Sequence, residues 1–555
     1  MSTGSSKVQS ANDAYISIIA SRQDAYTKVL ASGKFEPFVY PWDTFSAALL
    51  FLAILVIPRL PKRHRTLISL GTFTWIVYFC IQTMLKARCL GLANGYGIGL
   101  MCAWGMIVSV TLLFCNDARS DLQRIEWRKL EDDIKEHPNG AANGSASGAR
   151  SRKPTAEKRK VWSVDGPSAS VKNEETKKSS TKPYQLVWQG YPSSILHCME
   201  WTADLMTTFR GVGWNWRAPT CPPLDIPIKD PQGKLKPRNT ASTASSKTTN
   251  IPKPTLRKLQ LTGLRDFIIQ YLILDFLKTT MITDPYFMGA APLSSQSPWP
   301  FLASTTPNLT ISLLTRFIRL TFSITGVLSA LTFIFSLSPL FFVTVLPLIL
   351  PPQTLTYSPL FEPSLYPPYW GHLSEISKHG LASLWGKWWH QLFRFGISEP
   401  GRALIAYLNI DPKSQLARVI QLGIAFSLSG FIHASASFTT FSPSKPLSGP
   451  MVFFALQAVG IIAQTQVTAL LKKNVSFADW VGKATNVAFV VLWMCLTGPF
   501  LADDFARCGV WLFEPVPVSF LRGMIWGDWW AWKRIGDWVG WYRGETWYRS
   551  GLAIY

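Results

Sequence analysis

Long apolar runs constrain this chain more than any other feature of its sequence. Several of them reach the roughly 20 residues that a helix needs to cross the hydrocarbon core of a bilayer. We expect eight or nine spans, because Pro339 either kinks one helix or separates two. The chain is therefore predicted to be an all-α, polytopic transmembrane helical bundle. The runs lie near residues 43–60, 65–85, 90–115, 263–283, 310–336, 338–351, 416–438, 450–471 and 480–501.

The composition agrees with a membrane protein. Only 16% of the residues are charged and 48% are hydrophobic, whereas soluble domains are roughly 25% charged. Residues 1–34 lack a basic stretch followed by an apolar core, so we expect no cleavable signal peptide and an uncleaved first span. Eight cysteines are scattered without metal-type spacing, which predicts neither a disulfide framework nor a metal site.

The net charge of +22 would suggest nucleic acid as the partner of a soluble protein. Here the basic residues concentrate in loops, which favours positive-inside topology and attraction to anionic lipids. We expect no nucleic-acid binding, because no aromatic and basic groove accompanies the charge. The basic turn 59–65 and the loop after Cys115 are predicted to be cytosolic, and the N-terminus lumenal. Lys86 and Arg88 then fall on the lumenal side, against the rule.

Polar stretches divide the chain into segments. The run from Asn139 to Gly148 is of low complexity and cannot bury a core. The predicted segments are 1–115, N-terminal membrane helices; 116–190, a low-complexity basic cytosolic loop; 191–221, an amphipathic membrane-surface insert; 222–258, a polar linker; 259–510, a core of further membrane helices; and 511–555, a Trp-rich C-terminal tail.

His433 is the first candidate for chemistry, because it lies deep in the apolar run 416–438. An ionisable side chain at membrane depth is costly, and it usually faces the bundle interior and has a task. Imidazole also moves protons near neutral pH. The alternative is a structural hydrogen bond to a neighbouring serine such as Ser429. A Ser–His hydrolytic pair is disfavoured, since the chain has no GxSxG elbow.

The segment Leu384–Arg394, LWGKWWHQLFR, is the second candidate. Its aromatic and basic residues suit a helix that lies at the membrane interface, where Trp anchors and Lys or Arg snorkels. Alternatively, His390 enters the same bundle as His433, and the two rings together build a buried reaction site.

Two further motifs have structural interpretations. Asp275 lies in an apolar run, and we favour its pairing with a basic residue such as Lys278 over a role in orienting a catalytic ring. The stretch Arg210-Gly-Val-Gly213 lacks the lysine and the spacing of a P-loop. A tight turn flanked by aromatic anchors is the simpler interpretation.

Several motifs in this order resemble the wax-synthase-like branch of the membrane-bound O-acyltransferases, of the fungal secondary-metabolite acetyltransferase type. The resemblance runs from about residue 191 to about residue 507, and it makes 259–510 an acyltransferase core. The motifs are Leu384–Arg394, Phe431-Ile-His433-Ala, Gly449–Gln457, Arg210–Trp216, Tyr271–Asp275 and Leu496–Asp504.

The resemblance implies a role for each candidate residue. His433 matches the buried histidine of the family and would act as the general base on an alcohol. His390 occupies the position where many members have Asn, and it would polarise the thioester carbonyl or orient the substrate. Lys387 and Arg394 would contact the phosphates of CoA. No permanently bound cofactor or metal is implied, and acetyl-CoA, or another acyl-CoA, is the co-substrate.

The function expected from this resemblance is transfer of acetyl from acetyl-CoA to a hydroxyl of a lipophilic secondary metabolite such as a terpenoid. Acyl-CoA would enter a tunnel from the cytosol, and the alcohol from the membrane or the lumen. A long-chain wax ester synthase is the alternative within the class. A transporter or a non-catalytic scaffold is the alternative from another class, although no internal repeat is visible. We expect a multi-pass protein of the endoplasmic reticulum.

Overall fold

Seven helices in the described part of the chain are long and apolar enough to cross a membrane, as expected for a multi-pass membrane protein. A computed structural model describes residues 2–129, 184–222, 255–299, 302, 308–350, 357–474, 478–534 and 538–555. The seven spans are built on α2 (Phe45–Val56), α3 (Lys62–Lys86), α5 (Tyr96–Val110), α9 (Leu309–Leu340), α15 (Gln415–Phe438), α16 (Val452–Asn474) and α17 (Asp479–Arg507).

Pairing of the two chain ends identifies an eighth crossing. Strand β1 (Phe38–Tyr40) precedes the first span, and it pairs antiparallel with β5 (Gly551–Ile554), which follows the last. Both ends therefore lie on one face, which requires an even number of crossings. Helix α8 (Leu256–Met281) packs along α9 and has 26 residues, enough to span. Eight crossings agree with the predicted eight or nine.

Pro339 does not separate two spans. It lies inside α9, which continues through a π-helical turn (Phe341–Val345) into α10 (Leu346–Ile349). A proline deprives the carbonyl four residues earlier of its helical donor. In this chain the Tyr369 hydroxyl donates to that carbonyl, on Phe335. The runs 310–336 and 338–351 are therefore one helix.

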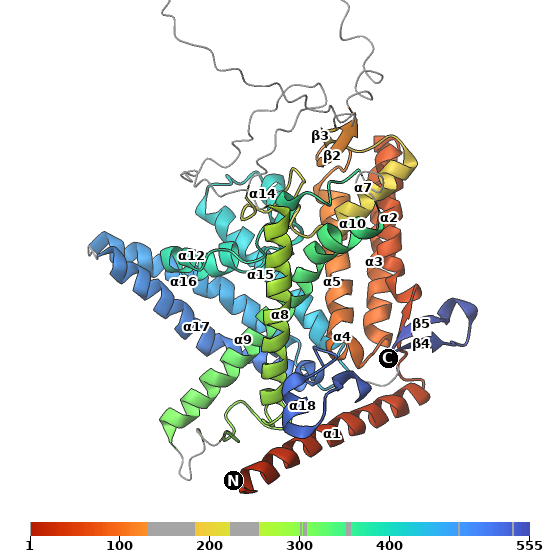
Figure 1. The fold of residues 1–555 in the computed structure, drawn as a ribbon. Helices are drawn as coiled ribbons and strands as arrows, with labels where there is room; N and C mark the ends of the chain where they lie inside the picture. The colour runs from red at the N-terminus through yellow and green to blue at the C-terminus, as the bar shows by residue number, and fades with distance from the viewer. Residues whose placement is uncertain are drawn as a thin grey trace, which may run out of the picture.

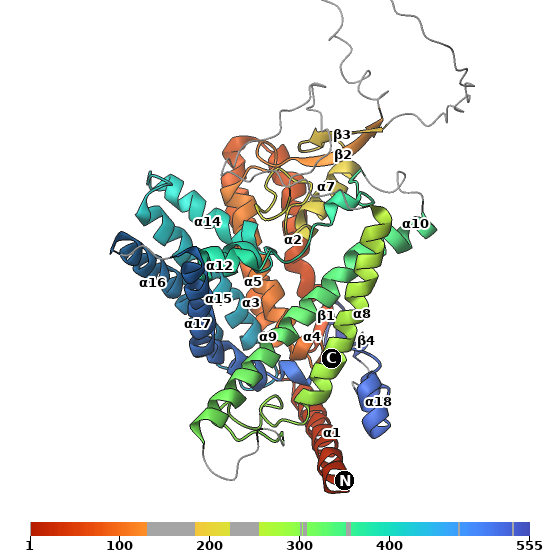
Figure 2. The ribbon, with the colours of Figure 1, turned by 60° about the vertical axis from the view of Figure 1, so that its left-hand side comes forward.

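Helix α15 lies at the centre of the bundle. It packs against α5 on one side and against α14 (Arg394–Tyr407) and α16 on the other. Helices α2 and α3 extend the first group, α17 extends the second, and α8 and α9 cross in front of them (Figures 1 and 2). The helix that carries His433 is thereby surrounded by protein.

A glycine permits the closest of these approaches. A Cβ atom on Gly99 of α5 would lie 1.9 Å from the carbonyl oxygen of Ser435 on α15. The Gly99 amide also donates to the Thr439 hydroxyl over 2.9 Å. Small residues let membrane helices approach closely in this way.

The two basic loops that were predicted to be cytosolic lie on the same face. Arg65 pairs with Asp117 at 2.9 Å, and Arg59 donates to the Tyr191 hydroxyl over 2.6 Å. The same face carries the two-stranded sheet of β2 (Arg124–Lys129) and β3 (Tyr184–Gln189), and helix α7 (Ile195–Thr207). Most of the predicted loop 116–190 and of the linker 222–258 lies outside the described residues.

A buried arginine organises the insert on this face. The Arg124 guanidinium is almost fully buried and pairs with Glu126 at 2.8 Å, with Asp204 at 3.0 Å and with Glu200 at 3.1 Å. A buried charge needs such partners. The ion pairs of Arg124 therefore join strand β2 to helix α7.

The opposite face carries α1 (Ser2–Ala31), α18 (Phe520–Trp526) and a three-stranded sheet in the order β1-β5-β4, with β4 at Val539–Tyr542. Asp275 binds this tail and does not orient a catalytic ring. Its carboxylate accepts from the Ser519 hydroxyl and from the Leu521 amide at the start of α18. Asp275 therefore has a structural role, but the partners that the structure gives it are a hydroxyl and a backbone amide and not the basic residue that was expected.

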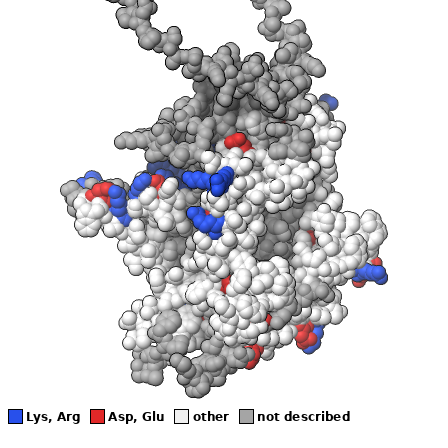
Figure 3. Space-filling view, in the orientation of Figure 1, with Lys and Arg blue, Asp and Glu red and all other residues white. Residues whose placement is uncertain are grey.

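Arg88 has a local reason to lie on the face predicted to be lumenal. Its guanidinium donates to the carbonyls of Met84 (2.9 Å) and Ala87 (2.7 Å), at the C-terminus of α3. A cation there compensates the negative end of the helix dipole. Of the described residues on the face drawn in Figure 3, most are white, that is, uncharged.

Candidate active site

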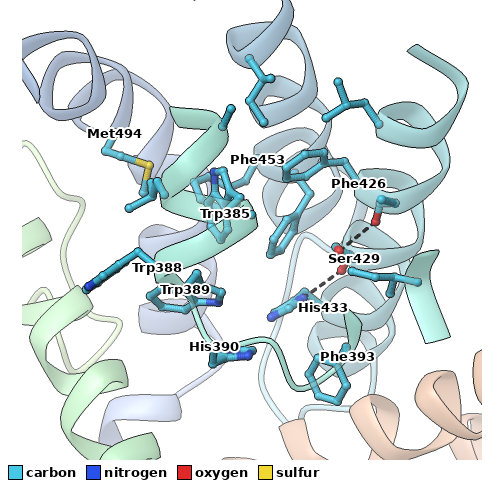
Figure 4. Close-up of a pocket in the computed structure, with 18 of the residues that line it drawn as sticks. Trp385, Trp388, Trp389, His390, Phe393, Phe426, Ser429, His433, Phe453 and Met494 are labelled. Carbon is cyan, nitrogen blue, oxygen red and sulfur yellow. Dashed lines mark hydrogen bonds between the residues drawn. The ribbon is translucent and has the colours of Figure 1, made fainter. Parts of the chain in front are cut away.

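A cavity of about 1200 Å³ lies inside the second group of helices. Its walls come from α9, α14, α15, α16, α17 and the segment 384–394, and apolar side chains dominate them. The two histidines singled out in the sequence, His433 and His390, both line it (Figure 4). A largely apolar pocket with a few converging polar groups is typical of a ligand or active site.

The His433 ring is held in one tautomer. Its Nδ1 lies 2.9 Å from the carbonyl oxygen of Ser429, one helical turn earlier on α15. A carbonyl only accepts hydrogen bonds, so Nδ1 carries the proton and Nε2 keeps its lone pair. The Phe454 ring packs against the imidazole with centroids 4.5 Å apart. His433 thus offers the cavity an oriented proton acceptor.

The prediction of a surface helix at residues 384–394 is wrong. The chain forms a π-helical turn over Leu384–Trp388, becomes extended at Trp389 and begins α14 only at Arg394. The buried Gln391 amide donates to the carbonyls of Trp385 (3.1 Å) and Trp389 (2.7 Å). These side-chain bonds replace the backbone bonds of a helix, and the bend carries the aromatic rings into the bundle.

His390 lies in this bend among aromatic rings. Ring centroids of Trp389, Trp370 and Phe393 are 5.1, 5.9 and 6.0 Å away. Its Nδ1 is buried and has no hydrogen-bond partner among the described residues. Burial, followed by the charges of His433 and Arg210, lowers the pKa of His390 to about 3. The ring is therefore neutral at physiological pH.

The two basic residues predicted to bind CoA differ in position. Lys387 does not line the cavity, and its ammonium pairs with Glu375 at 2.8 Å. Hydrogen bonds from Lys378 and Lys387 lower the pKa of Glu375 to about 2. Arg394 does line the cavity, but one of its nitrogens donates to the Gly386 carbonyl over 2.6 Å and stabilises the bend.

Sequence reasoning missed two arginines at the cavity wall. Arg402 on α14 and Arg418 in the first turn of α15 both line the cavity, and their side chains are exposed. Both helices lie at the face that carries the insert (Figure 1). In a sequence, a basic residue next to an apolar run is interpreted as a determinant of membrane topology. A further role of the same residue in ligand binding cannot be recognised from that pattern.

The cavity reaches the lipid-facing surface between α9 and α17. Ile324 of α9 and Val491 of α17 line it, and they are 37% and 46% exposed. Toward the face of the chain ends, Tyr96 packs on Phe505 with ring centroids 5.4 Å apart, and the Tyr96 hydroxyl donates to the His433 carbonyl over 3.4 Å. These contacts lie on the side of the cavity that is predicted to be lumenal.

Comparison with known proteins agrees with the resemblance. Residues 366–456, which include both histidines, match the model of the Membrane bound O-acyl transferase family. Over this segment the chain is similar to the membrane-bound O-acyltransferases. Its relatives include acetyltransferase ataH of Aspergillus terreus, which is 30% identical over 171 residues, 28% of this chain and 52% of the relative. No solved structure matches the chain.

Two further relatives differ in how much of the chain they cover. Acetyltransferase ple2 of Rhodocybe pseudopiperita is 32% identical over 139 residues, 25% of this chain and 36% of the relative. Acetyltransferase eriL of Hericium erinaceus is 21% identical over 350 residues, 62% of this chain and 77% of the relative. The chain thus spans about half of ataH and about a third of ple2.

The depressed pKa of His390 predicts an acid-sensitive fold for this protein. The ring titrates near 6.5 when unfolded and at about 3 when folded, so its contribution is complete above pH 6.5 and is lost as the pH falls toward 3. At pH 5 the free energy of unfolding is about 2 kcal/mol lower than at neutral pH because of this ring. We expect the melting temperature of the purified protein to fall less between pH 7.5 and 5 in His390→Asn than in the wild type. Equal falls would contradict the assignment of a buried neutral ring.

Proposed function

We propose that this chain is an acyl-CoA-dependent O-acyltransferase that transfers acetyl to a hydroxyl of a lipophilic alcohol. The observation that carries the proposal is His433, whose Nε2 is a free acceptor on the wall of a largely apolar cavity. An alcohol is a poor nucleophile until a positioned base takes its proton. A dry cavity also protects the thioester from water.

The geometry supports a single-displacement mechanism. As the alcohol oxygen attacks the thioester carbonyl, its proton passes to Nε2 of His433, and the Nδ1–H bond to Ser429 stabilises the cation that forms. The tetrahedral intermediate collapses, the carbon–sulfur bond breaks, and the CoA sulfur leaves with the proton that His433 received. The products are the ester and CoA, and the ring is neutral again.

His390 is placed to assist this step. Because its ring is neutral and one of its nitrogens is unpartnered, it offers a hydrogen bond that a substrate would complete. Donation to the thioester oxygen would stabilise the charge that develops there. An Asn side chain, which many members of the family carry at this position, can make the same donation.

Two access routes fit the two substrates. Arg394, Arg402 and Arg418 would bind the phosphates of CoA where the cavity opens to the face predicted to be cytosolic. Lys387 becomes a weaker candidate, because its ammonium is paired with Glu375. The lipophilic alcohol would enter from the bilayer between α9 and α17. We also propose a location in the endoplasmic reticulum.

The names of the relatives favour acetyl as the acyl group. The resemblance of the sequence motifs suggests a secondary metabolite such as a terpenoid as the acceptor. A long-chain donor is the second candidate, because the cavity extends past Trp385 to Ile461 and Val490 between α16 and α17. That apolar extension is longer than an acetyl group needs.

Donor and acceptor panels test both candidates. Microsomes that contain the protein would be incubated with labelled acetyl-CoA or palmitoyl-CoA and with panels of terpenoid and fatty alcohols, and the products identified by mass spectrometry. We expect acetyl esters of a terpenoid alcohol. Esters from palmitoyl-CoA alone would favour the wax ester synthase. No ester from any pair would contradict the acyltransferase assignment and favour a transporter or scaffold.

A further inference from the structure

The turn Arg210–Trp216 touches both sides of the bend that carries His390. It belongs to the insert on the face of β2 and β3, far from the bend in sequence. The Arg210 guanidinium is 8% exposed, and it donates to the carbonyls of Pro368 over 2.7 Å and Pro367 over 2.9 Å. It also lies over the Tyr369 ring at 5.0 Å. Arg210 therefore fixes the segment of chain that precedes the bend.

That segment in turn supports the bend directly. Trp370 packs against His390 and against Trp389, and its indole donates to the Thr332 hydroxyl of α9 over 2.9 Å. The next residue, Gly371, donates its amide to the Trp388 carbonyl over 3.0 Å. A rigid path of contacts thus leads from Arg210 to the imidazole.

The other end of the turn supports the bend from its far side. The Trp216 ring stacks on Phe395 in the first turn of α14, with centroids 4.1 Å apart and planes 19° apart. Gly211 makes this possible, because its φ is +60° and a Cβ atom there would lie 2.4 Å from the Trp216 ring. A glycine is needed both for the backbone angle and for the close contact.

We propose that the Arg210–Trp216 turn is a positioning element for His390, in which Arg210 holds the chain before the bend and Trp216 holds the chain after it. The inference rests on the proposed function, which places His390 in the reaction site. Between Trp389 and Phe393 the chain is not helical, and this part of the bend depends on outside support for a fixed geometry. Misplacement of a reacting group by about 1 Å can cost about 100-fold in rate.

Arg210→Lys is the main test variant, because a lysine keeps the charge but cannot donate to two carbonyls with a planar fork. We expect Arg210→Lys to lower kcat about 10-fold and Arg210→Ala about 100-fold, with KM for acetyl-CoA changed less than about threefold. Arg217→Ala is the matched control, because the Arg217 guanidinium donates to Pro222 within the insert. It should leave kcat unchanged.

A double-mutant cycle separates positioning of His390 from a general structural role. If Arg210 acts through His390, Arg210→Lys lowers kcat in the wild-type background and has no further effect in His390→Ala. An equal loss in both backgrounds would show that Arg210 acts elsewhere, and the proposal would be wrong.

Hydrogen exchange of the full-length protein provides a test that does not depend on turnover. We expect faster exchange in Arg210→Lys for peptides that cover residues 384–395, and unchanged exchange for α15. Unchanged exchange at 384–395, or a uniform rise along the chain, overturns the proposal. If the wild type forms no ester, the proposed function fails while the exchange result still decides whether Arg210 holds the bend.

Discussion

Replacing His433 with alanine should lower the rate of ester formation by about 100- to 10,000-fold, the usual contribution of a general base. The variant loses the oriented acceptor that His433 offers to the alcohol, Nε2 of this ring. It should leave the fold intact, because the hydrogen bond of the ring within the described residues goes to the adjacent turn of its own helix. The measurement is the initial rate with acetyl-CoA and an accepted alcohol, normalised to protein in the membrane.

The matched control for this prediction is His372→Ala. His372 lies in the loop before α12 (Ser374–His379), and its side chain is exposed and outside the cavity. It should retain the wild-type rate. If His433→Ala keeps more than about a tenth of the wild-type rate at equal abundance, His433 is not the base.

Gly99→Ala should be the most damaging single-methyl change in the bundle. The new Cβ would lie 1.9 Å from the Ser435 oxygen and 2.4 Å from the Ser435 carbonyl carbon. Both are backbone atoms, so no flexible side chain can yield, and α5 must move away from α15. Overpacking of this kind costs typically about 1–3 kcal/mol, and we expect about 3 kcal/mol or more here. The melting temperature and the amount of protein in the membrane should both fall.

Gly423→Ala on α15 is the control for Gly99→Ala. A Cβ atom there meets nothing within 4 Å, and alanine favours the helix over glycine by about 1 kcal/mol. We expect this variant to be as stable as the wild type or slightly more stable. Equal melting temperatures for the two variants would show that α5 and α15 do not meet as closely as described.

Hydropathy predicted most of the membrane helices because burial in lipid leaves a signal in every residue of a span. That signal is weaker for α8, whose charges include Asp275 and Lys278, but the run 263–283 was still among the predicted spans, and the paired strands β1 and β5 support its crossing. The two small sheets were not predicted. Strands of three or four residues that pair across the whole chain, such as β1 and β5, have no local pattern to detect.

The candidate site also contains residues that the sequence predicted and residues that it did not. His433 stood out because an ionisable residue in an apolar run is rare. The bend at His390 did not, because aromatic and basic residues have the same composition on a surface helix and in a buried turn. Arg402 and Arg418 were missed for a different reason. Only the three-dimensional fold shows that these two helical residues also border a cavity.

The pairing of β1 with β5 has a consequence for biosynthesis. Strand β1 is synthesised some five hundred residues before its partner residues, 551–554. Such distant contacts form late. Residues 38–40 therefore have no strand partner while the described spans are inserted. The sheet can form only after the chain has been translated through residue 554. A prematurely terminated chain would keep that strand edge open, which gives quality control a structural mark of incomplete synthesis.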